Sequence, residues 1–147
     1  MMMTTGTAGT LTLVRTIKAT PEAVFAAWTQ PEHLKHWSAP EGMEVAIAEV
    51  DLTAGGRFHI QMKNADGGEH NARGVYREID SPARLVYTWS WDEHPDAGES
   101  LITVEFRAVD GGTEVTMVHS GLPTEELVKD HEGGWTSCLN RLEKLYA

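Results

Sequence analysis

Positive charge is scarce in this chain. Lys and Arg number 12 against 22 Asp and Glu among 147 residues, which leaves a formal net charge of -10 at pH 7. A surplus of negative charge opposes general electrostatic attraction to nucleic acid or to an anionic membrane. We therefore expect no nucleic-acid partner and no membrane partner, while basic proteins remain open as partners.

Cysteine is nearly absent. Cys138 is the one cysteine, so no intramolecular disulfide can form. It lies among leucines in a segment of helical periodicity without an obvious activating base, which favours a buried, inert thiol over a nucleophile. A reduced thiol suits a cytoplasmic protein.

Long apolar runs are also missing. No segment approaches the roughly 20 apolar residues that a membrane-spanning helix requires, and the first ten residues lack the pattern of a signal peptide. We expect a cytoplasmic protein with one domain over residues 10–147, preceded by a flexible N-terminus at residues 1–9.

Strand periodicity is the main pattern that is present. Most of the chain between Met43 and His119 alternates with a period of two, and short turns rich in Gly, Asn, Asp and Pro interrupt it. Short turns between consecutive strands predict an antiparallel meander. About seven strands are expected, at residues 10–19, 43–52, 57–63, 70–79, 84–91, 100–109 and 113–120.

Helical signals occur at two places. Thr20 and Pro21 are typical of a helix start, and two short helices are expected before residue 38. Residues 124–147 form the longest helical segment, with apolar or aromatic side chains at spacings of three and four. The predicted stripe is Leu127, Val128, His131, Trp135, Cys138, Leu139, Leu142, Leu145 and Tyr146. The expected fold is α+β, with a curved antiparallel sheet wrapped around this helix.

Two glycines interrupt the long helix. Gly133 and Gly134 each cost about 1 kcal/mol relative to alanine in a helix. Either the helix approaches the sheet closely at this point, or the glycines form a thin wall over a cavity; the two interpretations are equally favoured.

Several motifs carry a resemblance to a known family. They look like those of the activator of heat-shock-protein-90 ATPase homologue family, and they occur in the same order from about Leu11 to the C-terminus. These motifs are residues 19–28, the cluster Pro31, Glu32, His33, Leu34 and Trp37, and residues 55–58, 74–79, 85–89 and 131–135. The resemblance implies the helix-grip fold of the START and birch-pollen-allergen superfamily, in which sheet and helix enclose an apolar cavity.

The resemblance also implies limits on function. Superfamily relatives bind lipids, hormones or polyketides, and some act as cyclases, so the fold does not select one function. The namesake activator carries an additional N-terminal domain that holds the chaperone. A chain of 147 residues has no room for that domain, so we expect no strong stimulation of a chaperone ATPase.

Aromatic side chains give the strongest indication of a binding site. Tyr87, Trp89 and Trp91 share a strand face, and aromatic residues on other expected elements could meet them. Pockets for small molecules are mostly apolar with a few placed polar groups. The candidate ligand-binding residues are Trp37, Phe58, Ile60, Tyr76, Tyr87, Trp89, Met117, His119, Trp135 and Leu139. Sequence alone does not settle which face of each strand points inward.

Histidines offer little support for metal binding or catalysis. His33 and His36 lie three residues apart, but no further ligand motif accompanies them, so no metal and no cofactor is expected. His131 and Glu132 are neighbours on a helix and point to different faces, which favours capping or surface roles. His119 either anchors a ligand in the cavity or bonds a neighbouring residue.

Three functions remain open. The leading hypothesis is a module, monomeric or homodimeric, that binds a small apolar or amphipathic molecule between the sheet and the long helix. The second is a chaperone co-activator or protein-interaction domain. The third is an enzyme such as a cyclase or hydrolase that uses His119 or a tyrosine as general acid or base.

Overall fold

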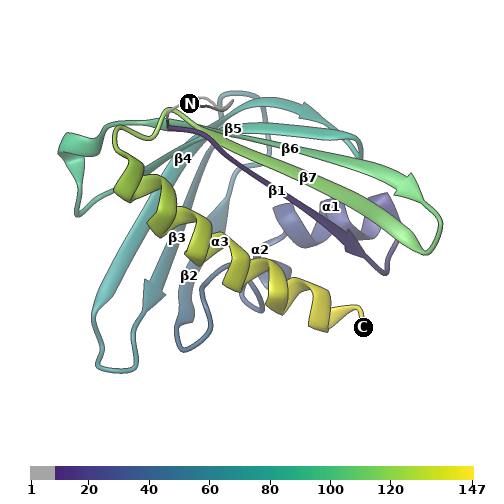
Figure 1. The fold of residues 1–147 in the computed structure, drawn as a ribbon, viewed down its shortest axis with the longest axis horizontal. Coiled ribbons are helices and arrows are strands. Elements are labelled where there is room, and N and C mark those ends of the chain that lie inside the picture. The colour runs from purple at the N-terminus through teal and green to yellow at the C-terminus, as the bar shows by residue number, and fades with distance from the viewer. Residues whose placement is uncertain (1–8) are drawn as a thin grey trace.

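The computed structural model describes residues 9–147, which form a curled seven-stranded antiparallel sheet and three α-helices (Figure 1). The strands are β1 Leu11–Ile17, β2 Glu44–Val50, β3 Arg57–Lys63, β4 Glu69–Asp80, β5 Arg84–Trp91, β6 Ser100–Val109 and β7 Gly112–Ser120. The helices are α1 Pro21–Thr29, α2 Pro31–Leu34 and α3 Glu125–Leu145, with a 3-10 turn η1 at Pro95–Ala97.

The strand order across the sheet is β1-β7-β6-β5-β4-β3-β2. Strands β2 to β7 follow one another as a meander, and β1 pairs with β7 at the far edge. The two short helices carry the chain from β1 to β2, which lie at opposite edges. Helix α3 crosses in front of the curled sheet (Figure 1). The α+β fold predicted from the sequence is confirmed.

Both of the longer helices begin where the sequence predicts. The Thr20 side chain accepts a hydrogen bond from the Ala23 backbone N–H (3.2 Å), and Thr124 accepts from Leu127 (3.1 Å). Such caps satisfy backbone donors that the first helical turn leaves without partners. Each threonine therefore fixes the entry point of its helix.

Two helices pack against the β1-β7-β6 side of the sheet. Helix α3 packs against β1, and α1 packs against β6 and β7. Phe25 of α1 meets Phe106 of β6 edge to face, with ring centroids 5.4 Å apart. Leu142 of α3 is fully buried, whereas Leu145 is 47% exposed. The prediction that Leu145 belongs to the buried stripe is wrong, because the last turn of α3 extends past the packed side chains.

Among the helices of this described range, none is long and apolar enough to cross a membrane.

Candidate ligand pocket

A pocket of about 390 Å³ lies between α3, the chain around α2 and the inward face of β3, β4 and β5. It is partly open to solvent. All five tryptophans of the chain line it, together with one phenylalanine and two tyrosines. These aromatic residues are Trp28, Trp37, Phe58, Tyr76, Tyr87, Trp89, Trp91 and Trp135.

Most of the candidate residues come together around this pocket. Seven of the ten line it, namely Trp37, Phe58, Ile60, Tyr76, Tyr87, Trp89 and Trp135. The other three, Met117, His119 and Leu139, do not line the pocket and are 0–1% exposed. They lie in the packed core, where α1 contacts β6 and β7 and Trp135 of α3 bonds to His119.

Several lining residues were not among the candidates. Trp91 shares the inward face of β5 with Tyr87 and Trp89, as strand alternation predicts. Trp28 lies on the buried stripe of α1, which gave no indication that it borders empty space. The remaining lining residues are Leu34, Ser38, Pro40, Met43, Met62, His70, Glu93, His94, Leu127, Asp130, His131, Gly134 and Cys138.

The aromatic rings contact one another in edge-to-face or tilted pairs. The ring centroids of Phe58 and Tyr87 are 5.3 Å apart, and those of Trp89 and Trp135 are 5.2 Å apart. Gly74 of β4 makes room for Phe58, because a Cβ at this position would collide with the Phe58 ring and the Thr88 carbonyl oxygen. A glycine in the neighbouring strand therefore positions one aromatic wall of the pocket.

Few polar atoms interrupt the deep part of the pocket. The Tyr87 hydroxyl accepts a hydrogen bond from Trp28 Nε1 (3.0 Å), and burial raises the pKa of the Tyr87 phenol above its usual range. Burial likewise raises the pKa of the Cys138 thiol to about 12. Both groups are protonated at neutral pH, so this part of the pocket presents no ionised nucleophile or base.

The indole N–H of Trp89 lacks a partner. It is the one buried side-chain nitrogen or oxygen in residues 9–147 without a hydrogen bond. The ring borders both the main pocket and a smaller void of about 20 Å³ beneath η1. A buried donor without a partner costs roughly 1–3 kcal/mol.

His119 belongs to a buried hydrogen-bond chain behind the pocket wall. Its Nδ1 accepts from Trp135 Nε1 (3.1 Å), so the proton resides on Nε2, which donates to Ser100 Oγ (2.7 Å). Ser100 in turn donates to the Trp89 carbonyl (3.2 Å). Burial, with a smaller effect of His131, lowers the pKa of His119 to about 3. His119 thus bonds its neighbours as a neutral ring.

His131 forms a second histidine–tryptophan pair. Its Nδ1–H donates to the Leu127 carbonyl (2.7 Å), and its Nε2 accepts from Trp91 Nε1 (2.9 Å). The sequence favoured a capping or surface role for His131. The half-buried ring instead joins α3 to the end of β5 and lines the pocket.

The mouth of the pocket is polar. Glu93, His94 and Asp130 are exposed lining residues, and His70 is half-buried beside them. His70 Nδ1 lies 2.6 Å from Glu93 Oε2, and the Asn71 backbone N–H donates to Glu93 Oε1 (3.2 Å). Partial burial raises the pKa of Glu93, but these hydrogen bonds outweigh that effect and lower it below its usual range.

The loop between α2 and β2 is fastened to α3 at the other side of the pocket. Arg141 Nη1 donates to three loop carbonyls, the nearest that of Ala39 at 2.6 Å. The Glu41 backbone N–H donates to Ser137 Oγ (2.7 Å). These bonds hold Pro40 and Met43 at the pocket wall.

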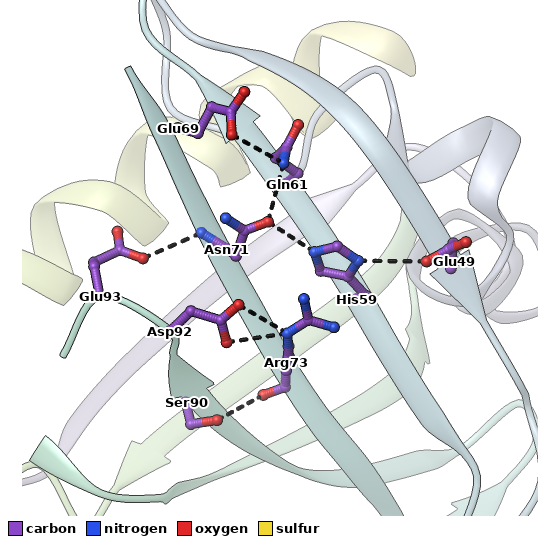
Figure 2. A network of polar contacts seen from close by, with 9 residues as sticks. All are labelled: Glu49, His59, Gln61, Glu69, Asn71, Arg73, Ser90, Asp92 and Glu93. Atoms are coloured by element: carbon purple, nitrogen blue, oxygen red, sulfur yellow. Dashed lines mark hydrogen bonds and ion pairs between the residues drawn. The ribbon is translucent and has the colours of Figure 1, made fainter. Parts of the chain in front are cut away.

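A separate polar network covers the opposite face of β3 and β4 (Figure 2). There Asn71 Oδ1 lies 2.8 Å from His59 Nε2 and accepts from Gln61 Nε2 (3.2 Å), while Arg73 pairs with Asp92. His59 and Gln61 alternate with the lining residues of β3, so they point away from the pocket. Within residues 9–147, no three His, Cys, Asp or Glu side chains are placed to hold a metal ion together.

Comparison with known proteins gives a consistent result. The family model described as "Activator of Hsp90 ATPase homolog 1-like protein" matches residues 18–147. A Dictyostelium discoideum protein named activator of 90 kDa heat shock protein ATPase homolog is 29% identical over 117 residues, which are 75% of this chain and 30% of that protein. The chain thus spans about a third of the length of the curated relatives it matches.

Solved structures resemble the fold over nearly the whole chain. A Chromobacterium violaceum protein is 28% identical with a TM-score of 0.84, and the match covers 93% of this chain and 96% of that one. An AHSA1 protein from Silicibacter pomeroyi is also 28% identical, with a TM-score of 0.83 and coverage of 92% and 95%.

Proposed function

The chain belongs to the family of activator of Hsp90 ATPase homolog 1-like proteins, and from that premise we propose that it binds a small apolar or amphipathic molecule in the pocket between the sheet and α3. The observation that carries the proposal is the composition of the pocket wall. Five tryptophans, two tyrosines and a phenylalanine surround about 390 Å³ of space.

The size and chemistry of the pocket support this proposal. Small-molecule sites typically enclose roughly 300–1,000 Å³ and combine apolar walls with a few oriented polar groups. Here the Trp89 N–H is a donor without a partner, and the charged side chains stand at the mouth. A pocket with apolar walls and a charged mouth suits a molecule with an apolar body and a polar end.

Titration with the neutral fluorophore N-phenyl-1-naphthylamine tests the proposal. We expect saturable enhancement of the probe's emission at one site per chain, with quenching of tryptophan emission, because the pocket tryptophans would contact the probe. Ile60→Trp should weaken binding at least several-fold, since Ile60 is buried at the pocket wall and a larger side chain occupies the space.

Gln61→Trp is the matched control. It adds the same side chain at the next position of β3, on the face that carries the polar network, and should leave affinity within about twofold. Absence of saturable binding to the wild-type chain, or equal weakening by both variants, would contradict a ligand site in this pocket.

A second candidate is assistance to a chaperone ATPase. It is favoured by the printed names of curated relatives, activators of 90 kDa heat shock protein ATPase. Titration of a purified chaperone of this class with the chain distinguishes the two candidates: several-fold ATPase stimulation at micromolar concentration supports the second, whether or not the pocket is filled.

A further inference from the structure

The charges that line the pocket are of one sign. Among the described residues 9–147, no Lys or Arg side chain borders the pocket, whereas the carboxylates of Glu93 and Asp130 stand at its mouth. Glu93 follows the end of β5, and Asp130 lies in the first half of α3. Two elements thus bring negative charge to one opening.

Each of the two half-buried histidines that line the pocket accepts a hydrogen bond at Nε2. Asn64 Nδ2 donates to His70 Nε2 (3.1 Å), which leaves the proton on Nδ1, facing Glu93. His131 Nε2 likewise accepts a hydrogen bond from Trp91 Nε1 (2.9 Å). Both oxygens of the Glu93 carboxylate accept hydrogen bonds, which hold its pKa below the usual range and keep it ionised at neutral pH.

Aromatic rings add to the attraction for a cation. Trp91 and Trp135 line the pocket, and the π faces of tryptophan rings attract cations. A carboxylate rim combined with aromatic walls is chemically suited to an organic ammonium ion. An anionic head group would meet like charge at the mouth and no basic partner along the described wall.

We propose that the ligand of this pocket is a cation, an organic ammonium whose charged end lies among Glu93, Asp130 and the nearby tryptophan faces while its apolar body fills the deep end. This inference rests on the proposed function, and it adds the charge of the ligand class.

Three probes of similar shape and different charge test the inference. Phenyltrimethylammonium, tert-butylbenzene and benzenesulfonate share a phenyl ring with a tetrahedral substituent and carry positive, zero and negative charge. Tryptophan fluorescence titrations at about pH 8 keep histidines of ordinary pKa neutral. The ammonium should bind roughly two- to thirtyfold more tightly than the neutral probe, the range expected for cation–π attraction, and benzenesulfonate should bind most weakly.

The three probes separate failure of this inference from failure of the proposed function. Equal affinity of the ammonium and tert-butylbenzene, or tightest binding of benzenesulfonate, would contradict the charge preference. Either result would still agree with an apolar binding site in this pocket. No saturable binding of any probe would count against both.

Substitution of the carboxylates gives a second test. Glu93→Gln and Asp130→Asn should each weaken phenyltrimethylammonium binding roughly 1.5- to fivefold, as for partly exposed charge pairs, and leave tert-butylbenzene affinity within about twofold. Asp110→Asn removes the same charge from the turn between β6 and β7, outside the pocket, and should change neither. Equal effects of all three variants, or no effect at Glu93 and Asp130, would overturn the assignment.

Discussion

The hydrogen bond from Trp135 and the burial of the ring both favour the neutral form of His119. His119 and His131 each accept an indole N–H, from Trp135 and Trp91 respectively, and their rings meet at right angles with centroids 5.1 Å apart. A protonated His119 would turn its acceptor into a second donor facing Trp135 and place charge in the core. Protonation of His119 should therefore oppose folding.

The sign of the resulting pH dependence follows from the lowered pKa of His119. Its ordinary value is 6.5 and its value in the fold is about 3, so the unfolded chain binds the extra proton between these values. The stabilising effect of a neutral His119 is complete above about pH 6.5. It is lost as the pH falls towards 3, by up to about 1.4 kcal/mol per pH unit.

Urea unfolding at several pH values checks this prediction with the variant His119→Asn. The amide oxygen can still accept from Trp135 and the side chain does not titrate, so the variant should be less stable at neutral pH and should lose less stability on acidification. His33→Asn, at an exposed histidine, is the control and should follow the wild type. Identical acid sensitivity of His119→Asn and wild type would contradict the role given to this histidine.

At the scale of the element, α3 forms one wall of the pocket, and its two glycines lie in this part of the chain. A Cβ at Gly133 would meet no atom within 4 Å, and one at Gly134 would meet only Pro40 Cγ, at 3.9 Å. Close approach of the helix backbone to the sheet therefore does not explain these glycines. Gly134 lines the pocket, which agrees with the alternative interpretation of a thin wall.

Alanine substitutions separate the helical and pocket roles of the two glycines. Gly133→Ala should raise the free energy of unfolding by about 0.5–1 kcal/mol, because alanine favours the helix and nothing obstructs its methyl group. Gly134→Ala should stabilise the helix similarly but add a methyl group at the pocket wall, and so weaken N-phenyl-1-naphthylamine binding.

Thermal unfolding and probe titration of the two variants supply the measurements, with Gly133→Ala as the matched control for affinity. Destabilisation by both substitutions would show that the helix needs close contact at this point. Unchanged probe affinity in Gly134→Ala would separate this glycine from the pocket.

At the scale of the whole molecule, the sheet depends on α3 for one side of its core. Trp135, Cys138, Leu139 and Leu142 are the buried residues of this helix, and they cover the inward face of the curled sheet. Deletion of residues 124–147 would expose that face to water. Because burial of apolar surface is the main driving force for folding, the remaining strands should lack a cooperative core.

We therefore expect the chain truncated after residue 123 to show no sharp thermal transition by circular dichroism or calorimetry. Removal of Tyr146 and Ala147 alone, which follow α3, is the control and should preserve the transition. A single cooperative transition in the longer truncation would mean that α3 is an appendage rather than part of the domain.

The order of the elements could be predicted from sequence because it depends on local patterns. Phe58, Ile60 and Met62 alternate along β3 with polar residues and are all buried, as a strand with one inward face requires. Thr20 and Thr124 cap helices through bonds to residues three positions ahead. These signals act within a few residues, so a single sequence contains them in full.

The location of the empty space was decided only by the tertiary structure. Met117 and Tyr87 both lie on inward faces, but α1 and α3 fill the space above β7 and leave it open above β3, β4 and β5. The tertiary structure likewise brings Glu93, which follows β5, and Asp130 of α3 to the same pocket mouth. Periodicity groups the side chains that share one strand face. Which face points inward, and whether its side chains meet other side chains or a pocket, depends on where distant helices pack, and no local pattern specifies that.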